Sequence, residues 1–465
     1  MKRLLIICLV VWLSGCASFT PKPLNPEARQ VTFESRSLIS SNVRQFFEHT
    51  LNHAITPWPP KSWTLATLTL AAYYFQPGID VAHARSLLAQ AGVITAGARP
   101  NPAISASSEY NTDTSGGISP WTNGLGIRVP IETAGKRDYR IQQAQHLARA
   151  ARLREADTLW QVRSHVRSSL LAAYPIDDLM GRQRELQQEI VRSLERRFAV
   201  GFISRPEITR AHLALNQATL SLQKNQTERA GNIALLAASV GVPVNAIKEL
   251  DISFDAFDLL PSVADLPSAD LRRQALLYRP DVLAALADYA ASQSALQLEI
   301  AKQYPDISLG PSYLWDAGEK KWSLGLSLVL PLFNHNQGTI AEAEANRKKA
   351  AAIFLAVQAR AIAELEQALA GYGHVTHMLE TADALLRNQR KKEHAVRAAC
   401  RAGEADRLAL LSAQYETVTA ELARVNVLKQ AQQILGRLED ALRLPLGADA
   451  LIPAVPQAVT LKQLR

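Results

Sequence analysis

The sequence contains few cysteines and few methionines, three of each in 465 residues. Cys8 lies in an apolar run near the amino terminus, so only Cys16 and Cys400 remain outside it. Two remaining cysteines are too few for a disulfide-stabilised scaffold. Beyond that first run, no stretch reaches the roughly 18 consecutive apolar residues that a transmembrane helix needs. If the chain crosses a membrane further along, we therefore expect strands to do so.

Signatures of catalysis and nucleotide binding are also lacking. Residues 134–137 lack the first glycine and the hydroxyl residue of a phosphate-binding loop, and no nucleophile elbow or zinc-binding helix motif is present. We therefore expect no enzyme and no cofactor. The formal net charge is +8, but the basic residues alternate with Asp and Glu along helical stretches. That pattern is typical of solvated helix faces and does not indicate nucleic-acid binding.

Two histidine pairs have the spacing of metal ligands on a helix. They are His49 with His53, and His374 with His377, which Met378 follows. Neither pair has an obvious third ligand. The sequence therefore does not support a metal site, and we predict none. The spacing by itself still leaves open whether either pair binds a metal.

The chain begins with the features of a bacterial signal peptide. A basic start is followed by the apolar run Leu4 to Leu13 and then by Ser-Gly-Cys-Ala at residues 14–17. This arrangement resembles the lipobox of bacterial lipoproteins, which implies cleavage before Cys16 and acylation of its thiol, for instance by palmitate. Ala17 replaces the Asp that usually retains lipoproteins in the inner membrane, which implies a lipid anchor in the outer membrane. A transmembrane anchor is the alternative, but the run is short for one.

The strongest pattern is an internal duplication with a spacing of about 200 residues. Pro77 and Pro280 open Ala-rich helical stretches, and Pro102 and Pro305 precede alternating segments. A repeat of this length indicates duplication of a whole structural unit. The expected organisation is a signal peptide (1–15), a tether and lead-in (16–62), a first repeat (63–248), a connection (249–268), a second repeat (269–446) and a tail (447–465).

Each repeat predicts a β-hairpin between helices, with strands at about 102–112 and 121–131, and at about 305–315 and 322–332. In the last segment apolar residues from Trp322 onward alternate with small or polar ones, over a length that suits a tilted outer-membrane strand. We expect a polar turn at residues 316–321. Four strands cannot close a barrel, so several chains must combine theirs. Aromatic residues near the loop ends are placed as in an interfacial girdle: Tyr110, Trp121, Trp315 and Trp322.

The remaining segments predict unusually long helices. A helical period continues for about 66 residues before Gly201, on the order of 100 Å if unbroken, and Pro175 should interrupt it. Ser204 to Glu207 has the form of a capping box, and Asp406 is the expected cap after Gly403. The returning helices carry apolar residues three and four positions apart, which predicts coiled-coil packing into a helical tube. The predicted fold is mainly α with a small β part.

These residues resemble the TolC-type outer membrane efflux family, most closely its heavy-metal efflux branch typified by CzcC. The matching segments are residues 129–137 and 330–338, where a strand meets a long helix, together with 278–281 and the reversals at Gly201 and Gly403. The similarity covers about residues 62–450. The junction residues that it singles out are Pro130, Gly135, Pro331 and Gly338.

The resemblance implies a homotrimer in which each chain gives four strands to a 12-stranded transmembrane barrel and long helices to a periplasmic tube. It further implies a passive exit duct of a tripartite efflux system, with heavy-metal cations as candidate substrates. The implied partners are a periplasmic adaptor (membrane fusion) protein, an inner-membrane pump of the resistance-nodulation-division type and outer membrane lipid. The alternative is a periplasmic coiled-coil lipoprotein, an adaptor or structural protein that does not span the membrane. Such a protein would not need duplicated hairpins with one apolar face.

The resemblance also implies that the helix reversals form a periplasmic tip that closes as a gate and contacts the adaptor. The charged tip residues could pair between protomers and hold the tube shut, or they could serve only as caps and solvated charges. Positions that carry gate carboxylates in TolC itself hold Ala409 and Ser412 here. The candidate tip residues are Gly201, Ser204, Arg205, Glu207, Arg210, Gly403, Glu404, Asp406 and Arg407.

Overall fold

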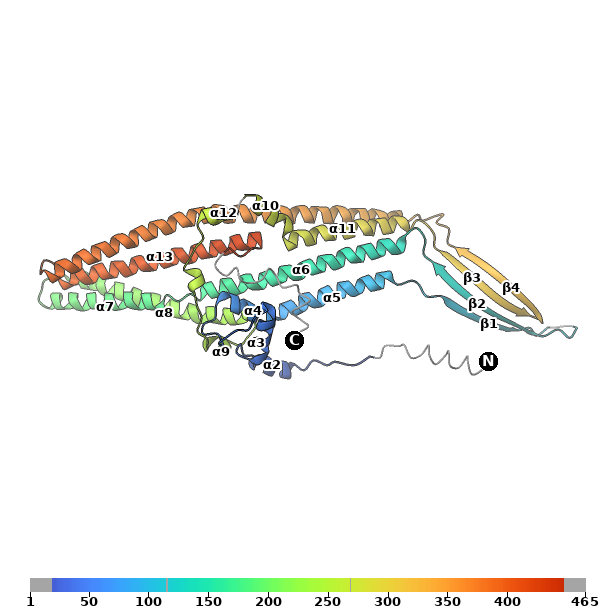
Figure 1. Ribbon diagram of the computed structural model, residues 1–465, viewed down its shortest axis with the longest axis horizontal. Helices are drawn as coiled ribbons and strands as arrows, with labels where there is room; N and C mark the ends of the chain where they lie inside the picture. The colour runs from blue at the N-terminus through green and yellow to red at the C-terminus, as the bar shows by residue number, and fades with distance from the viewer. Residues whose placement is uncertain (1–18, 114–115, 268, 447–465) are drawn as a thin grey trace.

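The computed structural model describes residues 19–113, 116–267 and 269–446, so Cys16, the expected signal peptide and the expected tail lie outside the described residues. The chain forms a long, narrow molecule with a four-stranded sheet at one end and two helix reversals at the other (Figure 1). The first repeat contains α5 (Pro77–Gly97), β1 (Ala103–Tyr110), β2 (Trp121–Ile131), α6 (Lys136–Ala172), α7 (Asp177–Ala199) and α8 (Arg205–Val240). The second contains α11 (Pro280–Ala301), β3 (Ile307–Asp316), β4 (Glu319–Leu328), α12 (Gln337–Arg401) and α13 (Arg407–Leu442).

Shorter helices lie around the middle of the molecule. They lie before the long helices of the first repeat or between those of the two repeats: α2 (Pro26–Glu34), α3 (Ser41–Leu51), α4 (Leu65–Phe75), α9 (Val244–Lys248), α10 (Ala269–Tyr278) and the 3₁₀ turns η1 (Asp255–Phe257) and η2 (Val263–Asp265). The main core lies here, where α3, α4, α6 and α8 meet. Its fully buried side chains include Phe46, Phe47, Trp63, Leu68 and Leu159.

The long helices follow from the sequence period and its interruptions. α12 has 65 residues and therefore extends for about 100 Å. Its counterpart in the first repeat is divided, because α6 ends at Ala172 and α7 begins at Asp177, with Pro175 between them. Proline has no backbone N–H, and in a helix its ring clashes with the carbonyl four residues earlier, which explains the predicted break. Within the described ranges, no helix combines the length and the apolar character needed to cross a bilayer.

The long helices pack side by side in a single curved layer, the helical wall. Near the sheet the order is α5, α6, α11 and α12, and toward the reversals it is α8, α7, α13 and α12. The wall therefore has two different open edges, one formed by α5 and α8 and the other by α12 (Figure 1).

Near the middle of the molecule, the end of one helix lies beside the start of another at two places, so that two shorter helices together cover the length of one long helix. α8 ends beside the start of α5, where Gly241 has φ +87 and a Cβ would lie 3.0 Å from the Phe75 carbonyl oxygen. α13 ends beside the start of α11, where Arg279 Nη1 donates to the Ala441 carbonyl at 3.0 Å. Only glycine suits the first position, because it needs both a left-handed backbone and no side chain.

The sheet order is β1-β2-β3-β4, with all neighbours antiparallel. The expected long turn at residues 316–321 is wrong. β3 continues to Asp316 and β4 begins at Glu319, so Ala317 (φ 50) and Gly318 (φ 100) form a two-residue turn. The expected end of β4 at residue 332 is also wrong: β4 ends at Leu328, because its partner strand begins there at Ile307.

Candidate functional site: the sheet and the helical tips

The sheet has two chemically different faces. Cross-strand partners share a face, so the registers place Leu125, Tyr313 and Trp322 in one row and Gly126, Ser312 and Ser323 in the next, on the opposite face. Leu324 on the first face is 73% exposed, so the rest of the chain does not cover that face. The apolar face comprises Ile104, Leu125, Ile127, Val129, Ile131, Ile307, Leu309, Pro311, Tyr313, Leu324, Leu326 and Leu328.

Aromatic side chains gather at the loop end of this apolar face. The rings of Tyr110 and Trp121 have centroids 4.9 Å apart, and those of Tyr313 and Trp322 are 4.8 Å apart. Trp315 lies opposite Asn123 on the same face. The aromatic residues singled out from the sequence thus lie at the end where a lipid–water interface places such side chains.

At the first strand-to-helix junction, a buried lysine joins the two repeats. Lys136 Nζ donates to Asp306 Oδ1 at 2.7 Å and to the Tyr304 carbonyl at 2.7 Å, and the Thr133 N–H donates to the same carboxylate at 3.0 Å. Gly135 has φ +71 at the start of α6. The junction therefore fixes the start of α6 against the segment that leads into β3.

The second junction differs from the sequence-based expectation. Asn336 takes the left-handed conformation with φ 63, and Gly338 lies inside α12. The Asn336 side-chain amide donates to the Glu299 carbonyl at 2.8 Å, which fixes α12 to α11. Pro130 lies within β2 opposite Ser308, and Pro331 follows the end of β4. Asn also tolerates positive φ, so the left-handed residue at this junction carries no glycine signature in the sequence.

The helix reversals at the tip are capped as predicted. Gly201 has φ +78 and Gly403 has φ +80. The Glu207 carboxylate accepts from the Ser204 N–H at 2.7 Å and from its hydroxyl at 2.9 Å. Asp406 Oδ1 accepts from the Ala409 N–H at 2.8 Å. Each cap satisfies donors at the start of a returning helix.

Two ion pairs join the tip of α13 to α7 within one chain. Asp406 pairs with Arg197, and Arg407 Nη2 lies 3.2 Å from Glu189 Oε2. Sequence reasoning singled out Asp406 and Arg407 but missed both partners. The partners are 209 and 218 residues away along the chain and look like ordinary charges on a solvated helix. Within the described ranges, Arg205, Arg210 and Glu404 form no direct ion pair.

Neither histidine pair gains further ligands in the part of the chain that the structure describes. No group of three His, Cys, Asp or Glu side chains there is arranged to hold a metal ion. His53 Nδ1 lies 2.9 Å from the Leu51 carbonyl oxygen, and His377 Nδ1 lies 3.2 Å from Glu380 Oε2. The metal question that the sequence left open stays open.

A buried charged cluster near mid-length was not predicted at all. Glu439 Oε2 lies 3.0 Å from Arg163 Nη1 and 3.2 Å from Arg167 Nε, and all three side chains are almost completely buried. Arg167 also donates to the carbonyl and the side chain of Gln432. The cluster joins α6 of the first repeat to α13 of the second.

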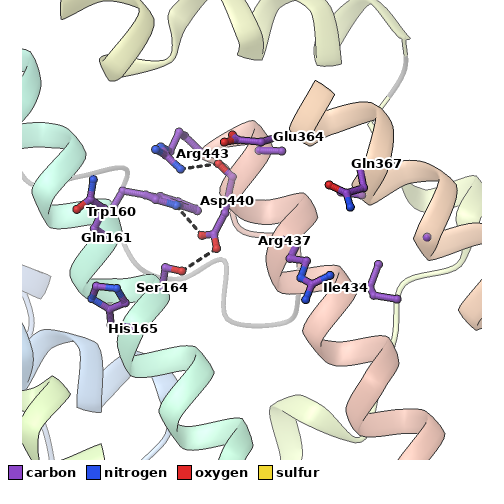
Figure 2. Close-up of a pocket in the computed structure, with 13 residues that line it drawn as sticks. Trp160, Gln161, Ser164, His165, Glu364, Gln367, Ile434, Arg437, Asp440 and Arg443 are labelled. Carbon is purple, nitrogen blue, oxygen red and sulfur yellow. Dashed lines mark hydrogen bonds between the residues drawn. The ribbon is translucent and has the colours of Figure 1, made fainter. Parts of the chain in front are cut away.

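A cavity of about 440 Å³ lies beside this cluster, between α6, α12 and α13. Figure 2 shows Asp440 pointing from α13 to α6, where it accepts from the Trp160 indole N–H at 2.9 Å and from the Ser164 hydroxyl at 2.7 Å. Arg443 lies at the end of α13 and pairs with Asp157 of α6 at 2.8 Å. These polar contacts hold the two repeats together at the level where α13 meets α11.

A family model described as outer membrane efflux protein matches residues 76–242 and 271–442. The cobalt-zinc-cadmium resistance protein CzcC of Cupriavidus metallidurans is 27% identical over 277 residues, which cover 57% of this chain and 62% of that protein, less than two thirds of its length. The pyoverdine export outer membrane protein OpmQ of Pseudomonas aeruginosa is 25% identical over 369 residues, or 72% of this chain and 74% of that protein.

Solved structures share the fold. The outer membrane protein VceC of Vibrio cholerae aligns with a TM-score of 0.64 at 21% identity, covering 87% of this chain and 98% of that one. The Campylobacter jejuni outer membrane channel CmeC aligns with a TM-score of 0.67 at 17% identity, covering 97% of both chains. The structure of CusC, which describes conformational changes during folding and transmembrane channel formation, aligns with a TM-score of 0.62 at 18% identity, covering 83% of this chain and 95% of that one.

Proposed function

Because the chain belongs to the outer membrane efflux protein family, we propose that it is the passive exit duct of a tripartite efflux system. Members of this family are channels rather than enzymes. An inner-membrane pump of the resistance-nodulation-division type would supply the energy, and a periplasmic adaptor would connect it to the tip. The observation that carries the proposal is the sheet, because its exposed apolar face and its small, polar opposite face suit lipid outside and water inside.

The two open edges of the wall support assembly into a ring. The edges differ, so a contact between α5 and α8 of one copy and α12 of the next is heterologous, and such contacts give a ring when the rotation between copies closes. Apolar side chains are exposed on both edges, for example Leu88 (74%) and Ile94 (79%) on α5 and Leu355 (60%) on α12. β1 and β4 are likewise open sheet edges that lipid does not tolerate. Three copies would give the 12-stranded barrel of the proposed homotrimer.

The deciding experiment is the mass of the assembly extracted gently from outer membranes with Cys16 intact. We expect a trimer that stays in the membrane after its acyl chains are removed, because the sheet itself spans the bilayer. A monomer that is released when the lipid is removed would instead favour the periplasmic coiled-coil lipoprotein. The lipid anchor at Cys16 is tested in the same preparation by the mass of the amino-terminal peptide.

Heavy-metal cations are the first substrates to test, and the name of one relative, a cobalt-zinc-cadmium resistance protein, supports them. The other relative is named for pyoverdine export, so pyoverdine is the second candidate. We propose that selectivity lies in the pump and the adaptor. Growth of a deletion strain on cobalt, zinc or cadmium, compared with its secretion of pyoverdine, separates the two.

We propose that the ion pairs of Asp406 and Arg407 hold the tip closed as a gate. Replacing both residues by Ala removes the contacts with Arg197 and Glu189, which join α13 to α7. We expect the conductance of the reconstituted channel and the leak of large antibiotics to rise several-fold. Glu404→Ala is the matched control, since Glu404 is an exposed tip carboxylate without a direct ion pair in the described ranges. Unchanged conductance in the double variant would show that these ion pairs do not hold the gate closed.

The pH dependence of this gate follows from Asp406. The Ala409 N–H and then the Arg197 guanidinium hold the pKa of the Asp406 carboxyl below its usual value of 3.8. A carboxyl group whose pKa is lower in the folded state than in the unfolded state stabilises the folded state at pH values above the unfolded-state pKa. That stabilisation is lost as the pH falls through the folded-state pKa. We therefore expect conductance to stay constant from neutral pH down to about pH 4 and to rise below it. A rise centred near pH 6.5 would point to histidine instead.

A further inference from the structure

Helix α2 packs on almost nothing in its own chain. It has nine residues, none of them buried, although the Asn25 side chain caps it by accepting from the N–H groups of Glu27 and Ala28. An isolated helix this short is unstable in water, so it needs a surface to pack against. Its apolar side chains are available for that contact: Val31 is 65% exposed, and Leu24, just before the helix, is 77% exposed.

Arg36, which follows the C-cap residue of α2, attaches this segment to the edge of the wall. Arg36 Nη1 donates to the Gly241 carbonyl at 2.6 Å and to the Phe75 carbonyl at 3.2 Å, where α8 meets α5. Its guanidinium carbon also lies 5.1 Å from the centre of the Phe33 ring, in the last turn of α2. Figure 1 shows α2 beyond the α5 and α8 edge, on the side away from α12. The helix therefore extends the edge that faces the next copy in the proposed ring.

The opposite edge carries a matching apolar surface at mid-length. Leu365 of α12 packs on Leu438 and Leu442 near the end of α13, which places this part of α12 near the middle of the molecule. The exposed side chains of this α12 surface are Leu355 (60%) and Ile362 (42%), which lie about two helical turns apart and therefore share one face of the helix. An unpaired apolar helix and an unpaired apolar helix face thus lie at similar height on the two edges that would meet.

We propose that α2 docks on the middle of α12 of the neighbouring copy and clamps adjacent protomers together. The inference rests on the proposed ring of copies, and it adds a contact outside both the sheet and the tip. The Val31 and Leu24 side chains would insert among the exposed α12 residues, while Arg36 holds the base of the clamp in its own chain.

Photo-crosslinking tests the contact directly. The full-length acylated protein, reconstituted as purified assembly in vesicles of outer-membrane phospholipid, carries benzoylphenylalanine in place of Val31. We expect illumination to give a two-chain adduct whose peptide maps to the part of α12 that carries Leu355 and Ile362. The same probe in place of Arg29, on the opposite side of α2, is the control and should give at least several-fold less adduct.

Each other outcome has a definite meaning. An adduct with lipid, or only with the chain's own residues, in a preparation that is trimeric overturns the clamp and leaves the proposed function intact. A preparation without any trimer contradicts the proposed function itself.

A second pair of variants tests the energy of the contact. Val31→Asp would bury a carboxylate against apolar side chains and should weaken the assembly about tenfold in its dissociation constant. Thr32→Asp places the same charge about a quarter-turn away, on a position that is also exposed, and should leave assembly unchanged. Equal effects of the two variants would contradict docking through the Val31 face.

Discussion

Replacing Glu439 by Gln is expected to destabilise the folded protein by about 3 to 5 kcal/mol, because it breaks a buried ion-pair cluster from one side. The carboxylate is almost completely buried and faces two buried guanidinium groups, those of Arg163 and Arg167. It also accepts from the Leu446 N–H at 2.8 Å. A neutral amide keeps the size of the side chain but removes the charge that balances both arginines.

The measurement is the urea concentration at half-unfolding in detergent, followed by far-ultraviolet circular dichroism. Glu416→Gln is the matched control, because it removes an acid of the same type on α13 whose partner Lys392 is exposed at the surface. Exposed pairs contribute less than about 1 kcal/mol, so this control should shift the midpoint little. If both variants unfold at the same urea concentration, the cluster does not hold the repeats together.

Placing an arginine on the apolar face of the sheet is expected to prevent assembly in the outer membrane. Leu324→Arg puts a charge in the middle of β4 on the face that would meet lipid, at a cost of about 2 to 4 kcal/mol per chain. In a homotrimer the cost applies three times. The measurement is the amount of assembled protein in purified outer membranes.

Ser323→Arg is a closely matched control for this prediction, because it introduces the same charge one residue away on the opposite face. The Ser323 hydroxyl lies 2.7 Å from the Ser312 hydroxyl among small, polar side chains. We expect this variant to assemble and to change only the conductance. The opposite pattern, in which Ser323→Arg fails to assemble and Leu324→Arg assembles, would mean that the polar face is the one that meets lipid.

Local features of this fold could be predicted because they depend on neighbouring residues. Pro175 interrupts the long helix, Gly201 and Gly403 end helices, and Asp406 caps one, since each effect arises from backbone geometry within a few positions. The alternating pattern around Leu324 likewise predicted a strand with one apolar face. The end of β4 was mispredicted because alternation continues past Leu328, whereas pairing depends on where β3 begins.

The sequence by itself determined the duplicated order of helices and strands, the two-faced hairpins and the positions of the reversals, because short-range sterics and side-chain period specify them. Only the tertiary structure decided that Arg163 meets Glu439, 276 residues away, and that Arg197 meets Asp406. A charged residue on a long helix has the same local sequence signature whether it faces water or a partner. Which of the two it faces is decided when helices far apart in the chain pack side by side.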